Sequence, residues 1–401
     1  MAQGDDEHGG KRMYTLTLKK GEERRSLVHP WVYANEVAKI EGKDKQGSIA
    51  KVLAYDGRFI GYGYINHKSK IIVRLLTRNE TEVNSELFYK RILNAKTLRE
   101  NLGYGDNYRA VFGESDLLPG LIVDKYGDHL SVQFLTLGME VRKETIRDIL
   151  VDIFKPKCIY ERSDVAVREK EGLLQSKGLL YGELDENLTI TENGIKMRID
   201  VANGQKTGYF LDQKENRDNL KHFVKGKTVL DCFCNQGGFS LCAAKYGAKS
   251  VLAADISELA LQSVRENAKL NGFTNIETVQ ADVFELLRAY RKENRTFDVI
   301  ILDPPAFAKT ADAVQNGYKG YLDINISALK ILNEGGYLIT CSCSKHMTPI
   351  LFNRMIAEAS SRTGIALRMV EMRAQSRDHA YLVGAEEGQY LKTAFLYRQI
   401  D

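Results

Sequence analysis

From about residue 225 onward, short apolar runs that each end in an aspartate alternate with segments of helical pattern. The helical segments span 238–246 and 258–270 and are followed by glycines that would end them. Apolar runs alternating with helices predict a parallel sheet with helices on both faces, which is a doubly wound α/β domain. Open α/β sheets bind ligands at the carboxyl edge of their strands, so four carboxylates there predict a binding site. The four strand-ending acids are Asp231, Asp255, Asp282 and Asp303.

The remainder of the chain divides into two smaller parts, as expected for 401 residues at roughly 100–200 residues per domain. We expect a small β-barrel domain at 13–80, a central α/β connecting domain at 85–190 and the doubly wound domain at 195–401. In the first part, alternating patterns and the Asp56-Gly57 turn predict strands. These strands are expected at 14–18, 48–55, 58–65 and 70–76. In the second part, we expect helices at 85–102 and 140–154 around strands and turns within 111–135; a hairpin at 190–200 follows.

The composition excludes several classes of protein. It is 43% apolar and 27% charged with only 6 Pro, which argues against a disordered or fibrous chain. We find no run of roughly 18–20 apolar residues for a membrane helix, and the acidic, Gly-rich start does not resemble a signal peptide. Six Cys do not make a disulfide framework in a chain of this length. We therefore expect a soluble, reduced, cytoplasmic protein.

Charge is distributed unevenly along the chain. Residues 11–79 carry 15 Lys and Arg against 6 Asp and Glu, a local charge of +9 within a net charge of +4. A small basic module joined to a near-neutral body predicts docking of a polyanion such as RNA. The alternative is an ordinary solvated basic surface.

The segment Asp231-Cys-Phe-Cys-Asn-Gln-Gly-Gly-Phe-Ser240 joins a strand to a helix through a glycine turn. Gly237 and Gly238 allow backbone to approach a ligand closely at the helix start. The segment lacks the G-x-G-x-x-G pattern, which argues against a nicotinamide or flavin enzyme. Asp255 is suited to bind both ribose hydroxyls, and Asp282 with its neighbours is suited to an adenine edge. Each Asp alone could instead be a helix N-cap, but all four at strand ends favour ligand binding.

Two further motifs follow. In Asp303-Pro-Pro-Ala-Phe307 the prolines predict a rigid loop facing a substrate, although a plain turn is the alternative. In amino-methylating enzymes an aromatic residue directly follows the second proline, whereas Ala306 intervenes here and argues against an amine acceptor.

Cys341 and Cys343 lie at a strand end, where a thiolate could add to C6 of a pyrimidine. Lys345 and His346 could lower the thiol pKa, while the alternatives are a buried apolar cysteine or a zinc site, for which Cys-x-Cys spacing is too close.

Motifs along nearly the whole chain resemble one family: S-adenosylmethionine-dependent ribosomal RNA cytosine-5 methyltransferases of the bacterial large-subunit type, with an N-terminal PUA-like domain. The segments that carry this resemblance are 118–126, 160–164, 206–217, 231–239, 303–307 and 342–344. The resemblance implies that the cofactor is surrounded by Gln213, Phe233, Asn235, Gly237, Asp255, Asp282 and Asp303. We add their neighbours Phe210, Asp231, Ile256, Ser257, Val283 and Pro304 to the expected cofactor site.

The resemblance also implies that Cys343 rather than Cys341 is the nucleophile. Ala306 stands where wider relatives often carry a second cysteine, so the C5 proton would go to another base, either Asp303 or water. The expected activity is formation of 5-methylcytosine in large-subunit ribosomal RNA, without a metal or a membrane, and a homodimer is left open. The alternatives are methylation of a guanine or adenine amine on the same scaffold, a small-molecule methyltransferase, and a non-catalytic RNA-binding protein.

Overall fold

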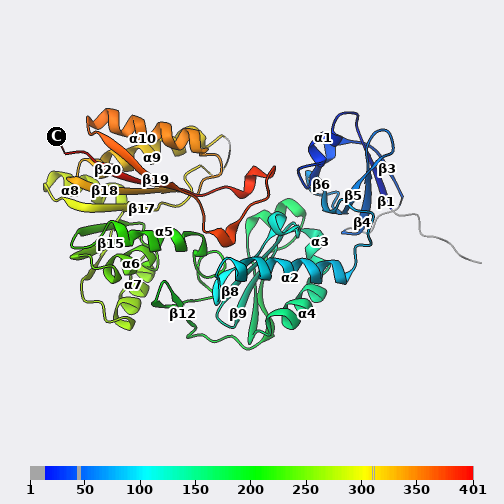
Figure 1. Ribbon diagram of the computed structural model, residues 1–401, viewed down its shortest axis with the longest axis horizontal. Helices are drawn as coiled ribbons and strands as arrows, with labels where there is room; N and C mark the ends of the chain where they lie inside the picture. Colours follow the sequence, from blue (N-terminus) through cyan, green and yellow to red (C-terminus); the bar gives the residue numbers. More distant parts are fainter. Residues whose placement is uncertain (1–13, 43–46, 309, 311, 401) are drawn as a thin grey trace, which may run out of the picture. The chain divides into compact units, whose positions relative to one another are not determined.

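The computed structural model describes residues 14–42, 47–308, 310 and 312–400, which fold into two compact units (Figure 1). The first unit comprises the chain through residue 184, together with 205–207 and 381–386. The second comprises 185–204, 208–380 and the residues from 387 onward. The N-terminal segment examined for a signal peptide lies outside the described residues.

The first unit begins with a six-stranded mixed sheet in the order β2-β6-β5-β4-β1-β3. Its elements are β1 (Tyr14–Leu18), α1 (Glu23–Ser26), β2 (Trp31–Tyr33), η1 (Ala34–Glu36), β3 (Val37–Glu41), β4 (Ile49–Leu53), β5 (Phe59–Ile65) and β6 (Ile71–Thr77). The four predicted strands correspond to β1, β4, β5 and β6, whose alternating apolar side chains fill the core of this sheet. The sequence did not predict β2, which has only three residues, or β3, whose side chains are mostly exposed.

A five-stranded sheet follows in the same unit, in the order β11-β10-β9-β8-β7. Its elements are α2 (Ser85–Asn101), β7 (Asn107–Phe112), η2 (Gly113–Asp116), β8 (Leu121–Tyr126), β9 (His129–Phe134), α3 (Leu137–Glu140), α4 (Lys143–Phe154), β10 (Cys158–Ser163), η3 (Ala166–Glu171) and β11 (Ser176–Gly182). Both long helices were predicted, and α2 and α4 pack together over one apolar core.

Glu171 ties the two sheets of the first unit together. Its buried carboxylate accepts hydrogen bonds from Asn66, from Ser69 and, at 2.7 Å, from Arg74. The hydroxyl of Tyr64 likewise bonds to Thr136 at 2.9 Å. Buried polar groups need such partners, so these contacts fix the six-stranded sheet to the five-stranded one.

The second unit opens with a hairpin of β12 (Thr189–Glu192) and β13 (Ile195–Arg198), where a hairpin at 190–200 was predicted. Two asparagines of helix α7 (Glu258–Leu270) and its C-cap extend this hairpin with their side-chain amides. The backbone N–H of Lys196 donates to Asn271 at 2.8 Å, and that of Arg198 donates to Asn267 at 2.9 Å. Asn271 also donates to the carbonyl of Lys196 at 2.7 Å, so its amide occupies the place of a neighbouring strand.

A seven-stranded sheet in the order β16-β15-β14-β17-β18-β20-β19 forms the centre of the second unit. Its strands are β14 (Thr228–Cys232), β15 (Ser250–Asp255), β16 (Ile276–Gln280), β17 (Phe297–Leu302), β18 (Leu332–Ser342), β19 (Leu367–Arg373) and β20 (Lys392–Arg398). The predicted parallel arrangement is confirmed for the five strands β14 to β18. β20 runs antiparallel to both of its neighbours and was not predicted.

Helices cover this sheet in two groups. Besides α7, they are α5 (Lys214–Asn219), α6 (Gly238–Lys245), α8 (Val283–Lys292), α9 (Val314–Leu329) and α10 (Pro349–Thr363). The short turns η4 (Leu211–Gln213), η5 (Leu220–His222) and η6 (Arg377–His379) belong to the same unit, and η7 (Glu386–Gly388) begins with the last residue assigned to the first unit. α6 packs with α5 and α7, whereas α9 packs with α8 and α10. Apolar side chains of α8, α9 and α10 share one core with the strands, which confirms the predicted doubly wound α/β class.

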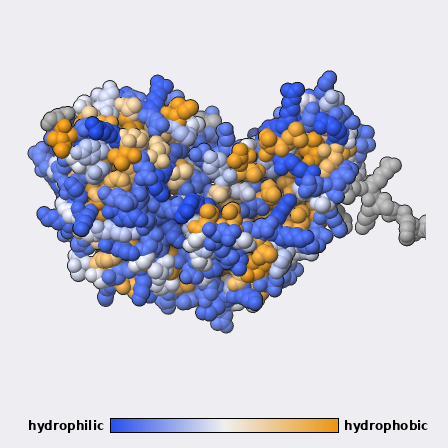
Figure 2. Space-filling view, viewed as in Figure 1, coloured by the Kyte–Doolittle hydropathy of each residue, from blue (hydrophilic) through white to orange (hydrophobic). Residues whose placement is uncertain are grey.

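Polar side chains cover most of the face seen in Figure 2, with hydrophobic residues in small groups among them. Within the described residues, none of the helices has the length and apolar character needed to span a membrane.

Candidate active site

The strand register brings Asp255 and Asp303 to one edge of the seven-stranded sheet. Cys232 at the end of β14 lies opposite Ala254 of β15 and Leu302 of β17. Asp255 and Asp303 are the residues that directly follow those two partners, so their carboxylates lie on either side of the turn after β14. Parallel strands that end in register therefore create the acidic edge predicted from the sequence.

Asp255 is held by two backbone N–H groups. One oxygen accepts a hydrogen bond from the N–H of Asn235 and the other from that of Ser257, each at 2.9 Å. Asn235 and Phe233 both have positive φ, of 48° and 61°, which few non-glycine residues adopt. The tight turn after β14 therefore aims its backbone at Asp255 and fixes the carboxylate before any ligand binds.

The two glycines of this turn are required by close packing. Gly237 has a φ of 83°, and a Cβ added there would lie 3.0 Å from Val264 of α7. A Cβ on Gly238 would lie 2.8 Å from both Arg217 and the hydroxyl of Tyr209. These glycines thus let α6 begin directly against α7 and the segment that carries Arg217.

Asp231 lies beneath the turn and is fully buried. Ser240 donates a hydrogen bond of 2.6 Å to one carboxylate oxygen, and the other oxygen has no partner among the described residues. Burial raises the pKa of Asp231 to about 7, and the nearby carboxylates of Asp303 and Asp255 act in the same direction. Ser240 opposes this shift by donating to the charged form.

Asp282 fills the helix-cap role that the sequence left open for it. It is the N-cap of α8, and one oxygen accepts hydrogen bonds from the N–H groups of Phe284 at 2.8 Å and Glu285 at 3.2 Å. Its side chain is nevertheless exposed next to the end of β16, so the capping contacts leave it accessible. The helix-cap alternative is therefore correct for Asp282, whereas Asp231, Asp255 and Asp303 are not caps.

The remaining predicted cofactor residues differ in exposure. Ile256 is 67% exposed, and Ser257 is the N-cap of α7, bonded to Ala260. Val283 and Pro304 are buried, and the side chain of Val283 belongs to the apolar core, which leaves it no free side-chain surface at the edge. The carbonyl of Phe210 accepts a 2.8 Å hydrogen bond from Arg217.

Asp303 stands at the end of a chain of hydrogen bonds that the sequence did not reveal. Gln213 donates to its carboxylate at 3.0 Å, and Asn216 donates to Gln213 at 2.7 Å. Arg373 in turn donates to Asn216 at 3.0 Å. Because an amide can donate and accept at once, the chain fixes which atom of Gln213 faces Asp303.

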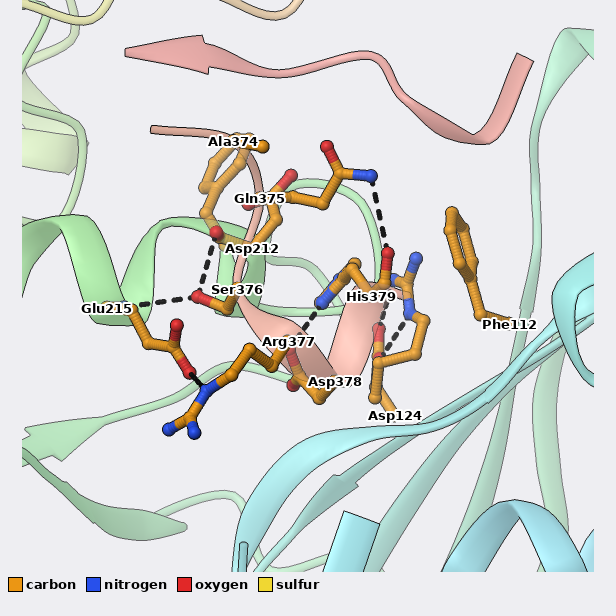
Figure 3. Close-up of polar contacts among 12 residues, drawn as sticks. Phe112, Asp124, Asp212, Glu215, Ala374, Gln375, Ser376, Arg377, Asp378 and His379 are labelled. Carbon is orange, nitrogen blue, oxygen red and sulfur yellow. Dashed lines mark hydrogen bonds and ion pairs between the residues drawn. The ribbon is translucent and has the colours of Figure 1, made fainter. Parts of the chain in front are cut away.

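The segment after β19 anchors the turn that carries Gln213 (Figure 3). Ser376 accepts from the N–H of Glu215 at 3.1 Å and donates to the carbonyl of Asp212 at 3.0 Å. The side chain of Arg377 donates to the carboxylate of Glu215 at 2.8 Å. Two segments that are about 160 residues apart in sequence are thereby held side by side, as Figure 3 shows.

Phe307 of the Asp-Pro-Pro loop packs into a group of aromatic rings. Its ring centroid lies 4.7 Å from that of Tyr321, 5.9 Å from Phe284 and 6.4 Å from Phe233. Aromatic pairs at these separations stabilise packing, so Phe307 holds its loop against α8 and α9.

The two candidate cysteines lie in different surroundings. β18 ends at Ser342, so Cys341 is inside the strand and fully buried, whereas Cys343 follows the strand and is partly exposed. Burial and the charge of Asp303 raise the pKa of the Cys341 thiol far above its usual range. Because the thiolate is the reactive form, Cys341 is poorly suited to nucleophilic attack.

The cation found beside Cys343 differs from those the sequence suggested. Lys345 is half-exposed, and its Nζ lies 4.0 Å from Oε1 of Glu387. Lys392 of β20 is buried and donates to the carbonyl of Ser344 at 2.7 Å. Burial lowers the pKa of Lys392 to about 8, and the charge of the Cys343 thiolate opposes this shift.

The residues at this edge fit an adenosyl ligand. A ribose needs a fixed hydrogen-bond acceptor, and Asp255 is held in place by two N–H groups. The glycine turn packs the start of α6 directly against Val264 of α7 and against Arg217. Among the described residues, no group of three or more His, Cys, Asp or Glu is arranged to hold a metal ion.

Two segments match known protein families. Residues 16–78 match the PUA-like domain, and residues 174–385 match the S-adenosylmethionine-dependent methyltransferases. In sequence, the chain is 43% identical over 386 residues to the ribosomal RNA large subunit methyltransferase I of Shewanella denitrificans, covering 94% of this chain and 97% of that protein. It is 42% identical over 387 residues to the protein of the same name from Vibrio cholerae, with the same coverage.

Solved structures show a similar fold. A protein from Streptococcus mutans assigned as a SAM-dependent methyltransferase superposes with a TM-score of 0.81 at 23% identity, over 96% of this chain and all of that one. A second structure, of a protein assigned as a methyltransferase and in complex with SAH, has a TM-score of 0.82 at 22% identity and the same coverage.

Proposed function

Because the chain belongs to the S-adenosylmethionine-dependent methyltransferases, in the family of ribosomal RNA large subunit methyltransferase I, we propose that it forms 5-methylcytosine in large-subunit ribosomal RNA. The family match supports the cofactor and the methyl transfer. The cytosine C5 atom as the acceptor is the finer part of the proposal, and the position of Cys343 supports it. A ribosomal RNA substrate implies the cytoplasmic location expected from the sequence.

In this proposal the chain has three domains, which span residues 13–80, 85–190 and 195–401. The first part would bind RNA, since Lys19, Lys20 and Lys70 are exposed and form no ion pair with a described residue. Several other basic residues of this part are paired, among them Lys39 with Glu41 at 2.7 Å. Exposed cations without a protein counter-ion are suited to contact phosphates.

The cofactor would lie along the carboxyl edge of β14, β15, β16 and β17. Asp255 would bind its ribose, Asp282 would flank the adenine, and Gln213 with Asp303 would border the methyl group. The backbone around Phe233, Asn235 and Gly237 would contact the amino acid part, with Phe210, Asp231, Ile256, Ser257, Val283 and Pro304 around them. When bound, S-adenosylmethionine supplies a methyl group activated by a positively charged sulfur.

In the proposed mechanism, Cys343 makes the cytosine carbon nucleophilic. Its thiolate would add to C6, and the electron pair of the C5–C6 double bond would then form the new bond between C5 and the methyl carbon. The bond from that carbon to the sulfonium sulfur would break at the same time, and its electron pair would stay on the sulfur. A base removes the C5 proton, the double bond forms again, and the thiolate leaves. Asp303 and water are the two candidates for this base. Gln213 would keep Asp303 oriented throughout.

A single observation carries the C5 assignment: Cys343 is the partly exposed cysteine directly beyond the end of β18, where the acidic edge lies. The test uses a large-subunit ribosomal RNA fragment that contains 5-fluorocytosine. Fluorine cannot leave as a proton does, so we expect a covalent adduct that maps to Cys343.

The matched variants are Cys343→Ala and Cys341→Ala. We expect Cys343→Ala to lose turnover while it keeps cofactor affinity, and Cys341→Ala to keep most activity. An adduct on Cys341 would reverse the assignment. Full activity of Cys343→Ala with methyl on a base nitrogen would favour the amine alternative instead.

A further inference from the structure

Lys392 is a buried cation without an acidic partner. It is 4% exposed, and no carboxylate among the described residues lies within ion-pair distance of its amine. Its Nζ donates to the carbonyls of Ser344 at 2.7 Å and Tyr390 at 2.9 Å. Burying a lone charge is costly, so such a site suggests that a negative charge forms nearby at some stage.

Strand pairing places this amine beside the turn that carries Cys343. In the antiparallel β18–β20 ladder, Lys392 is the partner of Ser342 and Thr393 is the partner of Cys341. Since the amine also bonds to the carbonyl of Ser344, Lys392 contacts both sides of Cys343 along the chain. An ammonium has three N–H donors, and the two carbonyls use two of them, which leaves one for another acceptor.

The other charged or titratable groups near Cys343 come from three directions. Tyr321 of α9 has a pKa raised by burial and bonds to Ser344 at 2.9 Å, so it is neutral. Asp303 follows β17 and interacts with the neighbouring Cys341; its charge would disfavour a thiolate. On the same turn, Lys345 lies near Glu387, which offsets its charge, and His346 is partly exposed. Lys392 is therefore the buried cation that can favour the thiolate.

We propose that Lys392 is a positioning residue that stabilises the thiolate of Cys343 and fixes the turn that presents it. This inference rests on the proposed role of Cys343. The ammonium group of Lys392 would offset the thiolate charge in the free enzyme, and it would do so again when the thiolate leaves C6 of the cytosine. The lowered pKa of Lys392, about 8, is consistent with a cation that has no carboxylate to keep its proton.

The test measures how the alkylation rate of Cys343 by iodoacetamide depends on pH, with peptide mapping to separate Cys343 from Cys341. In the unmodified full-length protein we expect a midpoint below 8.5, the usual thiol value. In Lys392→Met we expect the midpoint to rise by about one pH unit or more, as removal of a nearby cation predicts. The control Lys345→Met should keep the original midpoint, and so should Lys392→Arg, which retains the charge.

A midpoint at or above 8.5 in the unmodified protein would overturn the proposal without any variant. An unchanged midpoint in Lys392→Met, with cofactor affinity retained, would overturn it as well and leave Lys392 only its carbonyl contacts. If Lys392→Met does not fold, the midpoints of the unmodified protein and of Lys345→Met decide the question. Thiol alkylation needs no RNA, so this result is independent of the RNA trapping test: a shifted midpoint together with full activity of Cys343→Ala would contradict the proposed function alone.

Discussion

The basic residues of the six-stranded sheet and the acidic residues at the edge of the seven-stranded sheet are held in opposite ways. Lys19 and Lys20 follow the end of β1 and are exposed, whereas both oxygens of Asp255 accept hydrogen bonds from backbone N–H groups. A polyanion of irregular shape can be met by mobile cations, but a small ligand requires fixed acceptors. The number of charged residues therefore locates a surface that binds a polyanion, whereas backbone geometry defines a site for a small ligand.

The largest effect is expected for Asp255→Ala, which tests whether a fixed carboxylate binds the cofactor. The substitution removes an acceptor that the fold has already oriented, so we expect cofactor affinity to fall by about 1–3 kcal/mol. Isothermal titration calorimetry with S-adenosylmethionine measures the change. Glu258→Ala at the start of α7 is the control, because its carboxylate pairs with Arg265 on the exposed side of that helix. Unchanged affinity in Asp255→Ala would remove this residue from the site.

The exposed cations should give a smaller and salt-dependent effect. In the triple variant Lys19→Ala, Lys20→Ala and Lys70→Ala, the log–log slope of RNA affinity against salt should fall by about 0.7 for each lost phosphate contact. Filter binding of a large-subunit ribosomal RNA fragment at several salt concentrations measures the slope, and cofactor affinity should stay the same. Arg58→Ala is the control, because Arg58 pairs with Asp56 at 2.9 Å. An unchanged slope would mean that these lysines form only a solvated surface.

The smallest expected effect concerns Asp231. Its pKa is raised to about 7 in the folded state, so the folded protein binds this proton more tightly than the unfolded chain does. The stabilisation is therefore fully present below pH of about 4 and is lost as pH rises through about 7. Asp231→Asn keeps an acceptor for Ser240 but cannot ionise. Between pH 5 and 8 its melting temperature should fall less than that of the unmodified protein, by a difference on the order of 5 °C. If the melting temperatures of the two proteins changed by the same amount between pH 5 and 8, the raised pKa of Asp231 would be contradicted.

Local patterns predicted most elements that are long and regular. The strand-ending acids, the glycine turn at 237–238 and helices such as α7 depend on neighbouring residues, so the sequence alone located them. The fold class and the family were confirmed by the comparisons. The site assignments stay predictions, although the structure places Asp255 and Asp303 at strand ends on either side of β14 and joins Gln213 to Asp303 by a hydrogen bond.

What the sequence did not predict depends on contacts between distant segments. Lys392 reaches Ser344 across 48 positions, and Arg373 reaches Asn216 across 157. No local pattern encodes the antiparallel pairing of β18 with β20, which creates the first contact. The sequence does contain a signal, because Lys392 is a lone lysine at the start of the apolar strand β20. What this lysine contacts depends on the pairing of β20 with β18.

The amides that border the β12–β13 hairpin affect how the protein behaves at high concentration. An open strand edge presents unpaired N–H and C=O groups to which a second chain can add, and this is a common route to aggregation. Here the side chains of Asn267 and Asn271 occupy those groups on β13. An asparagine of α7 and the asparagine that caps this helix thus do for the β13 edge what natural proteins often achieve with charged or proline-containing edges: they keep that edge from becoming a template for intermolecular β-structure.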